Sequence, residues 1–358
     1  MDCRSIEELT IPDSVRVLGN TAFGGCSSLR SVTFTANSSL EEAPAAFLYC
    51  PMLKSASVPA VAVSGLDYNY IEHITVVCGT EIGEYALSDR DQLVSITLPD
   101  TITTIGEMAF YSCEALESII IPDAVITIGN EAFKECLSLK TVEIGKNSLL
   151  EELGVSSFFN CPLLEGFYFP SGICKIGNNT FFGCESLAEI DFTDCTKLTE
   201  IGEYAFSWCK QLKTVSIPST VILIGEWAFG DCHNMESFSF GEASKLLGIA
   251  PSTFSGCHSL TELILPDTIE YIKEDAFFYC ESITRFVIPE RVAYIEEDVF
   301  RCCYSLKEII FTDPEGWWYA PHFNAKDGTP VSSAEMSDST TLVTYFTDTF
   351  MKYYWHKS

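Results

Sequence analysis

Residues Ala109–Asp123 read A-F-Y-S-C-E-A-L-E-S-I-I-I-P-D, and this stretch decides the fold. Reduced to a pattern, A-F-x-x-C-x-x-L-x-x-I-x-I-P-D, it recurs in some form along almost the whole chain. A fixed period of this length is typical of a solenoid, in which each coil packs against its neighbours. The repeat therefore takes precedence over the two or three globular domains that 358 residues would otherwise suggest.

The coils are aligned by a Phe and by the Cys that follows it three positions later. From Phe110 onward, consecutive Phe residues of this kind lie 23 to 25 positions apart, so the register is well kept. One coil departs from the pattern, because Leu87 takes the Phe position and Arg90 takes the Cys position. The other pairs are Phe23/Cys26, Phe47/Cys50, Phe110/Cys113, Phe133/Cys136, Phe158/Cys161, Phe181/Cys184, Phe206/Cys209, Phe229/Cys232, Phe254/Cys257, Phe277/Cys280 and Phe300/Cys303.

Each coil divides into a strand, a turn and a return segment. Apolar residues alternate, which places Ile119 and Ile121 on the inner side of a strand and Ser118 and Ile120 on its outer side. Pro122 ends that strand, because proline cannot donate to the ladder. The A-F-x-x-C-x-x-L piece is too short for a regular helix and is predicted as a turn or a 3₁₀ piece. We therefore expect a solenoid of about 14 parallel β-strand coils, mostly strand and turn with little α-helix.

Two regions near the start of the chain are irregular. The gap of 40 residues between Phe47 and Leu87 is too long for one coil. It predicts an irregular coil and insertion over 59–86, with a strand within 71–76 and residues 60–69 bulging outward. Cys3 fits the Cys position of a coil whose Phe would precede residue 1. The sequence is therefore expected to begin inside a repeat, as a fragment of a longer natural chain.

The repeat pattern stops after Phe311. Residues 1–311 are predicted as the solenoid and residues 312–358 as a C-terminal cap, since an uncovered last coil would expose a large apolar patch. A short helix is expected over 337–347, with Ser337 or Asp338 as its N-cap. The favoured interpretation of the many aromatic residues in this segment is that they cap the solenoid. The alternative is that they form a platform for a ligand.

The formal charge of −29 comes from 50 acidic and 21 basic residues. Such a charge opposes binding to nucleic acid or to an anionic lipid surface. No stretch of the sequence approaches 18 consecutive apolar residues, so no membrane insertion is predicted. A solvated acidic surface is the favoured interpretation, and attraction of a basic partner or of cations is the alternative.

The sixteen cysteines do not follow a disulfide or zinc pattern. Twelve of them, Cys3 and the eleven paired above, occupy one position of the repeat and are predicted to form a buried column of unpaired thiols. The others are Cys78, Cys174, Cys195 and Cys302, and none of these lies in a C-x-x-C pair. Zinc and redox chemistry therefore have no support in the sequence.

No other motif points to catalysis or to a cofactor. His233 and His258 follow repeat cysteines in successive coils and should stack, and Glu281 of the next coil is the candidate for a further metal ligand. A solvated edge is favoured over a metal site, since a third convergent ligand is not established. No phosphate-binding loop and no positioned nucleophile and base are found. We expect no enzyme, no cofactor and no metal.

The consensus A-F-x-x-C-x-x-L-x-x-(I/V)-x-(I/L)-P-x-x-(I/V)-x-x-I-G resembles the BspA-like, treponeme-type class of leucine-rich repeat. The coils at 105–110 and 201–206 match it closely, and the resemblance extends from residue 3 to about 311. It implies a cell-surface or secreted bacterial protein, with relatives in anaerobic protists. Members of the family are associated with adhesion to host proteins or to other cells, and the family supplies no catalytic residues.

The concave face of such a solenoid is the expected binding surface. Its outward strand residues are mostly Ser and Thr, which are common on solvent-facing strands. The most distinct patch contains Tyr168, Glu189 and Asp191, flanked by Glu143. We therefore expect recognition of a protein partner, either a host extracellular protein or a bacterial surface protein. The alternative is a structural spacer that presents another domain of a longer surface protein.

Overall fold

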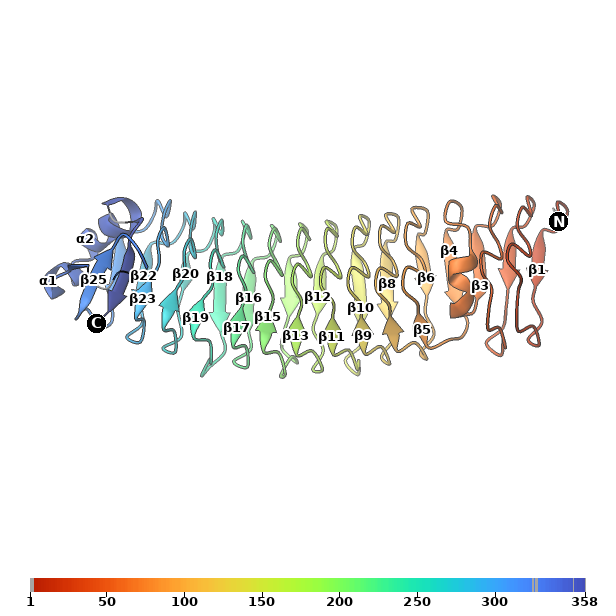
Figure 1. Ribbon diagram of the computed structural model, residues 1–358, viewed down its shortest axis with the longest axis horizontal. Coiled ribbons are helices and arrows are strands. Elements are labelled where there is room, and N and C mark those ends of the chain that lie inside the picture. Colours follow the sequence, from red (N-terminus) through yellow and green to blue (C-terminus); the bar gives the residue numbers. More distant parts are fainter. Residues whose placement is uncertain (1–2, 324, 326–327, 350, 358) are drawn as a thin grey trace. The chain divides into compact units, whose positions relative to one another are not determined.

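The computed structural model describes residues 3–323, 325, 328–349 and 351–357. Residues up to Ile173 form one compact unit and residues from Cys174 onward form a second one. Within each unit, parallel strands follow one another in sequence order, one coil after the next (Figure 1). The chain is a parallel β-solenoid of about 13 turns with little helix, which confirms the predicted fold class.

Each coil contributes one longer strand, and fourteen of these are present among the described residues, as predicted. In the first unit they are β1 (Glu8–Thr10), β2 (Ser31–Thr33), β3 (Ser55–Val58), β4 (His73–Val76), β6 (Ser95–Thr97), β8 (Ser118–Ile121), β10 (Thr141–Ile144) and β12 (Gly166–Tyr168). In the second they are β14 (Glu189–Asp191), β16 (Thr214–Ile217), β18 (Ser237–Phe240), β20 (Glu262–Leu263), β22 (Arg285–Ile288) and β24 (Glu308–Phe311).

The return segments form shorter strands of two residues each. In the first unit these are β5 (Glu81–Ile82), β7 (Thr104–Ile105), β9 (Thr127–Ile128) and β11 (Glu152–Leu153). In the second they are β13 (Lys175–Ile176), β15 (Glu200–Ile201), β17 (Leu223–Ile224), β19 (Gly248–Ile249), β21 (Tyr271–Ile272) and β23 (Tyr294–Ile295). Pairing is in register, so that equivalent residues of successive coils lie side by side; for example, Thr127 pairs with Thr104.

The core consists of columns of like side chains. Ile119 and Ile121 are buried, whereas Ile120 is 64% exposed, which confirms the predicted alternation. The repeat Phe residues stack face to face from coil to coil, with ring centroids 4.9 Å apart for Phe110 and Phe133. Burying such a ring stabilises the fold by roughly 1.5–3 kcal/mol, so every coil adds to the apolar interior of its unit.

A pair of left-handed residues lies around each Phe and closes the turn. Around Phe110 they are Met108 (φ 51°) and Ser112 (φ 54°), and the same pair of positions recurs along the chain. Glycine fills the second position in the coils of Gly25, Gly183 and Gly256. Because the left-handed conformation interrupts helical backbone, the A-F-x-x-C-x-x-L piece forms turns, as predicted.

The irregular coil differs from its prediction. Residues 60–69 do not bulge outward: Ala60–Gly65 form a 3₁₀-helix, η1, with Ala62 and Val63 fully buried. The predicted strand within 71–76 is present as β4 (His73–Val76). Arg90 is buried at the Cys position of the next coil, where its Nη2 donates to the backbone oxygen of Leu66 at 3.2 Å. The guanidinium thus takes over the hydrogen bond that a thiol makes in the regular coils.

The C-terminal segment contains β25 (Trp317–Ala320), β26 (Thr329–Pro330), α1 (Ser333–Met336), α2 (Ser339–Thr344), the π-helical turn η2 (Tyr345–Thr349) and β27 (Tyr354–Lys357). Strand β27 pairs antiparallel with β23 and with β25. The Phe346 ring contacts Phe300 and Phe311, so this segment packs on the last coils. The predicted cap role and the boundary at residue 312 stay predictions.

The helix predicted over 337–347 is present two residues later in the chain, as α2 (Ser339–Thr344) followed directly by the π-helical turn η2 (Tyr345–Thr349). Helix α2 begins after Asp338, whose Oδ1 accepts from the backbone N–H of Thr340 at 3.1 Å, so Asp338 is the N-cap of the two alternatives. Helix α1 was not predicted, although Ser332 and Glu335 form a capping box before it. In the described parts of the chain, no helix has both the length and the apolar character needed to cross a membrane.

Candidate functional site

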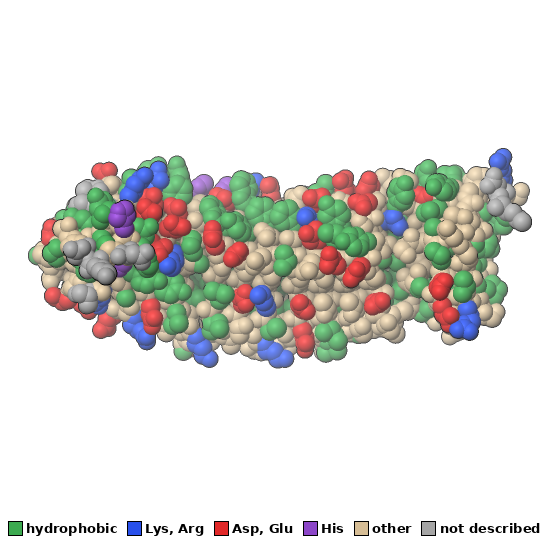
Figure 2. Space-filling model, in the orientation of Figure 1, with side chains coloured by type: hydrophobic (Ala, Val, Ile, Leu, Met, Phe, Trp, Pro, Cys, Tyr) green, Lys and Arg blue, Asp and Glu red, His purple; other side chains and the backbone are tan. Residues whose placement is uncertain are grey.

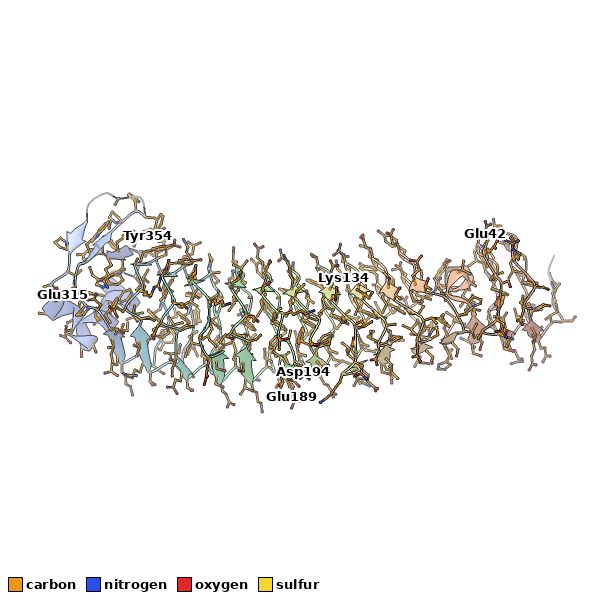
Figure 3. All side chains as sticks on the ribbon, turned by 90° about the horizontal axis from the view of Figure 1, so that it is seen from below. Glu42, Lys134, Glu189, Asp194, Glu315 and Tyr354 are labelled. Atoms are coloured by element: carbon orange, nitrogen blue, oxygen red, sulfur yellow. The ribbon has the colours of Figure 1, made fainter. Side chains whose placement is uncertain are left out.

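The outward side chains of the longer strands form the surface that we call the strand face. All four predicted binding residues lie on it: Glu143 is exposed on β10, Tyr168 is half-buried on β12, and Glu189 and Asp191 are exposed on β14. Glu189 lies at the outside of the ribbon in Figure 3. Glu143 and Tyr168 belong to the first unit and the other two to the second. That these four residues form one contiguous patch therefore stays a prediction.

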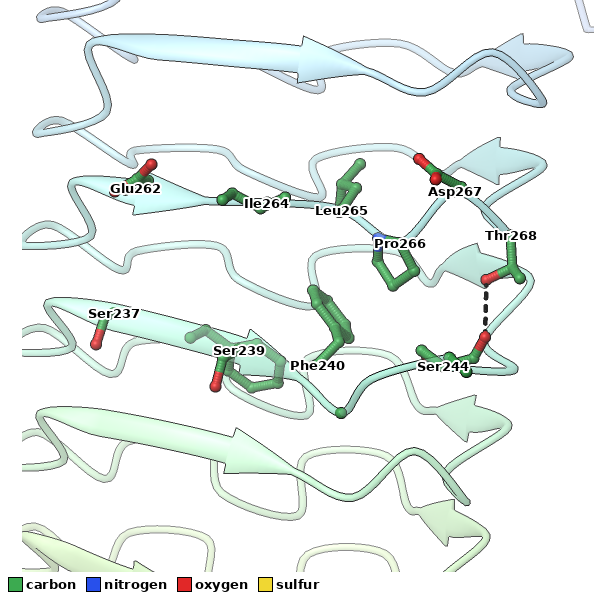
Figure 4. A pocket seen from close by; sticks show the side chains of 13 residues that line it. Ser237, Ser239, Phe240, Ser244, Glu262, Ile264, Leu265, Pro266, Asp267 and Thr268 are labelled. Atoms are coloured by element: carbon green, nitrogen blue, oxygen red, sulfur yellow. Dashed lines mark hydrogen bonds between the residues drawn. The ribbon is translucent and has the colours of Figure 1, made fainter.

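A different part of the strand face is hollowed. In the second unit, two adjoining hollows of about 520 and 480 Å³ lie on either side of the segment that follows β20. They share Glu262, Ile264, Leu265 and Asp267 in their linings. Figure 4 shows the first hollow, with Glu262 and Asp267 toward its two ends and Ile264 and Leu265 between them.

The strand ladder is interrupted at this hollow. Strands β16 and β18 pair over four residues each, but β20 pairs with β18 only through Glu262 and Leu263. Strands β22 and β24 then form a separate two-stranded sheet. Among the residues that the structure describes, neither Ile264 nor Leu265 has a register partner in β18 or β22. The backbone polar groups of this segment are therefore open to a ligand or to solvent.

The charge at the hollow is predominantly negative. Arg285 is neutralised by Glu308, because its Nε donates to Oε2 at 2.7 Å. Glu262 and Asp267 are exposed and take part in no ion pair within the described portion of the chain. Figure 2 shows Asp and Glu side chains over the visible faces of both units, with fewer Lys and Arg. Two uncompensated carboxylates therefore flank an exposed isoleucine.

The alternation of apolar residues also places Glu262 and Ile264 on the outward side of their strand, but it does not distinguish them from the outward residues of other coils. The segment Leu263–Pro266 reads L-I-L-P, the same pattern as V-S-I-P at Val215–Pro218 in a coil whose strand β16 pairs with β18 over four residues. No signal in the sequence separates the two coils. The exposure of Ile264, which reaches 74%, is the feature that marks the site in the structure.

The column of repeat cysteines has a structural role. Each thiol for which a bond is resolved donates to the backbone oxygen of the preceding coil, as Cys136 does to Phe110 at 3.2 Å and Cys280 to Phe254 at 3.2 Å. Burial raises the pKa of the Cys113 thiol to about 12. A thiol that stays protonated is a poor nucleophile and a poor metal ligand, so the column serves to join coils.

The stacked histidines offer no resolved metal site. The rings of His233 and His258 lie parallel, with centroids 4.7 Å apart, in a row with Trp208 and Tyr279. Asp231 Oδ1 lies 3.6 Å from His233 Nε2. Within the described residues, no group of three or more His, Cys, Asp or Glu side chains is placed to hold a metal ion. Metal binding through Glu281 therefore gains no support from the geometry.

Comparison with known families agrees with this architecture. A model described as the BspA type leucine rich repeat region matches in six copies, over residues 1–77, 80–212 and 199–315. The chain belongs to the BspA-type leucine-rich repeat family. This confirms the resemblance that the repeat consensus indicated. No functionally curated protein is significantly similar to the chain.

Solved structures of similar fold include two bacterial proteins. A leucine-rich repeat protein of Bacteroides ovatus is 26% identical, with a TM-score of 0.57 over 85% of this chain and 80% of that one. A leucine-rich cell surface protein of Faecalibacterium prausnitzii is 23% identical, with a TM-score of 0.46 over 86% and 88%. The first of these supports the fold, and neither printed name specifies a ligand.

Proposed function

We propose that this chain is a non-enzymatic, cell-surface or secreted protein that recognises another protein through its strand face, as an adhesin does. Leucine-rich repeat solenoids are interaction scaffolds whose strand surface is the usual contact area. The observation that carries the proposal is the strand face itself. Coil after coil, it presents outward side chains from a rigid backbone, as the alternation of β8 and β16 illustrates. The surface location rests on the family resemblance.

A large, regular and acidic surface suits a protein partner better than a small substrate. Enzymes need a concave site that brings together groups with complementary roles. The buried thiols of the column are held protonated, and the hollows of the strand face are shallow and lined by side chains without an acid–base pair. An acidic surface also favours fast encounter with a basic partner.

The proposal is tested by a binding screen of the purified chain against extracellular-matrix proteins and bacterial surface proteins. A variant carrying Tyr168→Ala, Glu189→Ala and Asp191→Ala is compared with a control carrying Ser118→Ala, Ser216→Ala and Ser237→Ala on the same face. We expect a partner whose affinity falls at least about tenfold, or about 1.4 kcal/mol, in the first variant and not in the second.

The other outcomes of the screen are equally informative. A partner that binds both variants as tightly as the parent chain places recognition outside the predicted patch and rejects the role of these three residues. Absence of any partner contradicts the proposal. The chain would then act as a spacer that presents another domain of a longer surface protein.

A further inference from the structure

We propose that the hollow after β20 is a binding site for an extended peptide segment in which an apolar side chain lies between basic ones. The inference rests on the proposed function and narrows it to one site and one class of partner. Three independent features of the second unit carry it: an exposed apolar floor, open backbone groups and uncompensated carboxylates.

The apolar floor is formed by side chains from three coils. Ile264 is 74% exposed, and half-buried Phe240 and Val287 line the hollows on its two sides. Exposed apolar surface of this kind is favourable to cover, by about 25 cal/mol for each Å² removed from water. The hollows of about 520 and 480 Å³ are wide enough for aliphatic side chains, and both are open to solvent along one side, as an extended peptide requires.

The open backbone groups favour an extended main chain as the ligand. Ser239 and Phe240 pair with β16 on one side, but the coil on their other side leaves the ladder after Leu263. An extended peptide can hydrogen-bond to such groups, as in the addition of a strand to a sheet edge. A ligand without backbone amides could fill the hollow, but it would not form the paired hydrogen bonds that the open backbone N–H and C=O groups can make with a peptide.

The carboxylates set the charge of the partner. Glu262 and Asp267 lie toward opposite ends of the first hollow in Figure 4, with Ile264 between them. In an extended peptide, side chains alternate between the two faces, so residues two apart point the same way. A peptide with lysine or arginine two positions before and two positions after an apolar residue therefore places positive charge against both carboxylates, and the charge of −29 assists its approach.

The probe is a fluorescein-labelled peptide that repeats the unit Lys-Ser-Val-Ser, called the lysine–valine peptide, so that lysine and valine point to the same face; it is blocked at both ends, and binding is followed by fluorescence anisotropy on the full chain. We expect saturable binding that weakens at least about tenfold with Ile264→Glu. The double variant Glu262→Gln, Asp267→Asn should weaken binding and reduce its dependence on salt between about 0.05 and 0.5 M.

The matched control is Ile120→Glu. Ile120 is likewise an exposed outward isoleucine, 64% accessible, and it lines a hollow of about 590 Å³ together with Asp123 and Glu143. It differs from Ile264 in lying on β8, which pairs in register with β10 over four residues, so the comparison tests the open backbone. Its substitution adds the same charge to the strand face and should change affinity by no more than about twofold. Both substituted positions are exposed, so circular dichroism and thermal melting should show folded variants.

Two further peptides isolate the backbone and the charge. A lysine–valine peptide with N-methylated amides cannot donate hydrogen bonds from its backbone and should bind at least about tenfold more weakly than the unmethylated peptide. A glutamate–valine peptide should not bind. Equal loss in the Ile120→Glu and Ile264→Glu variants, equal binding of the N-methylated peptide, or no binding of the lysine–valine peptide would overturn the inference. If a protein partner from the screen binds while this peptide does not, the proposed function stands without this site.

Discussion

At the scale of single residues, the repeat cysteine explains how one side chain joins two coils. Its Sγ reaches the backbone oxygen of the preceding coil at 3.1–3.3 Å along the chain, as at Cys113, Cys209 and Cys257. Cysteine suits the position because it combines a small apolar volume with a weak donor. A larger polar side chain would have to be hydrogen-bonded completely in this dry interior.

This arrangement predicts a sharp difference in thiol reactivity. Under a short pulse of iodoacetamide at about pH 8, the exposed Cys174 should be alkylated, whereas Cys113 and Cys136 should not be. Burial raises the pKa of Cys113 to about 12 and that of Cys136 well above its ordinary value. Peptide mass spectrometry gives the labelled positions, and the same pulse in denaturant is the control. Labelling of Cys113 in the folded chain would contradict the burial of the repeat cysteines away from solvent.

Asp275 gives a prediction about pH and stability. Burial, followed by the charges of Asp298 and Glu274, raises the pKa of Asp275 to about 6. The folded state then binds this proton more tightly than the unfolded state does, so stability should rise as pH falls from about 7 toward 4. Asp275→Asn removes the buried charge and tolerates the left-handed φ of 54°. It should raise the Tm at pH 7 and flatten this part of the stability profile.

Asp313→Asn is the opposite control for that experiment. The Lys357 ammonium group holds the pKa of Asp313 below its ordinary value, so its contribution to stability is present at neutral pH and is lost in acid. Its replacement should lower the Tm at pH 7. Calorimetric melts of both variants between about pH 4 and 7 measure the two changes in Tm. If both substitutions change the Tm at pH 7 in the same direction, the opposite pKa shifts assigned to Asp275 and Asp313 are rejected.

At the scale of the elements, the sequence predicted what depends on local pattern. The inward position of Ile119 follows from alternation, and the structure confirms it. Capping chemistry limited the N-cap to Ser337 or Asp338, and the structure selects Asp338. The 3₁₀-helix Ala60–Gly65 was not foreseen, because its burial depends on contacts with coils distant in sequence. Helix α1 had a visible signal at Ser332 that was not used.

The candidate site shows the same division between local pattern and tertiary packing. Alternation identifies Glu262 and Ile264 as outward residues of their coil. Whether two successive coils remain paired depends on the packing of both, and the L-I-L-P pattern of the open coil does not encode it. A hollow produced by an interrupted ladder is therefore a tertiary property that becomes visible only in three dimensions.

At the scale of the whole molecule, the excess of acidic residues should make stability depend on salt. A net charge of −29 on one chain repels itself, and dissolved ions screen this repulsion over about 10 Å at 0.1 M. The Tm should therefore rise by a few degrees when NaCl increases from about 10 to 300 mM, and KCl should act equally. CaCl₂ at matched ionic strength separates screening from specific binding, since a cation site would add a saturable increase. A Tm that is unchanged or falls with NaCl would show that the carboxylates are too well spaced or paired to destabilise the fold, and the acidic surface would then act on partners alone.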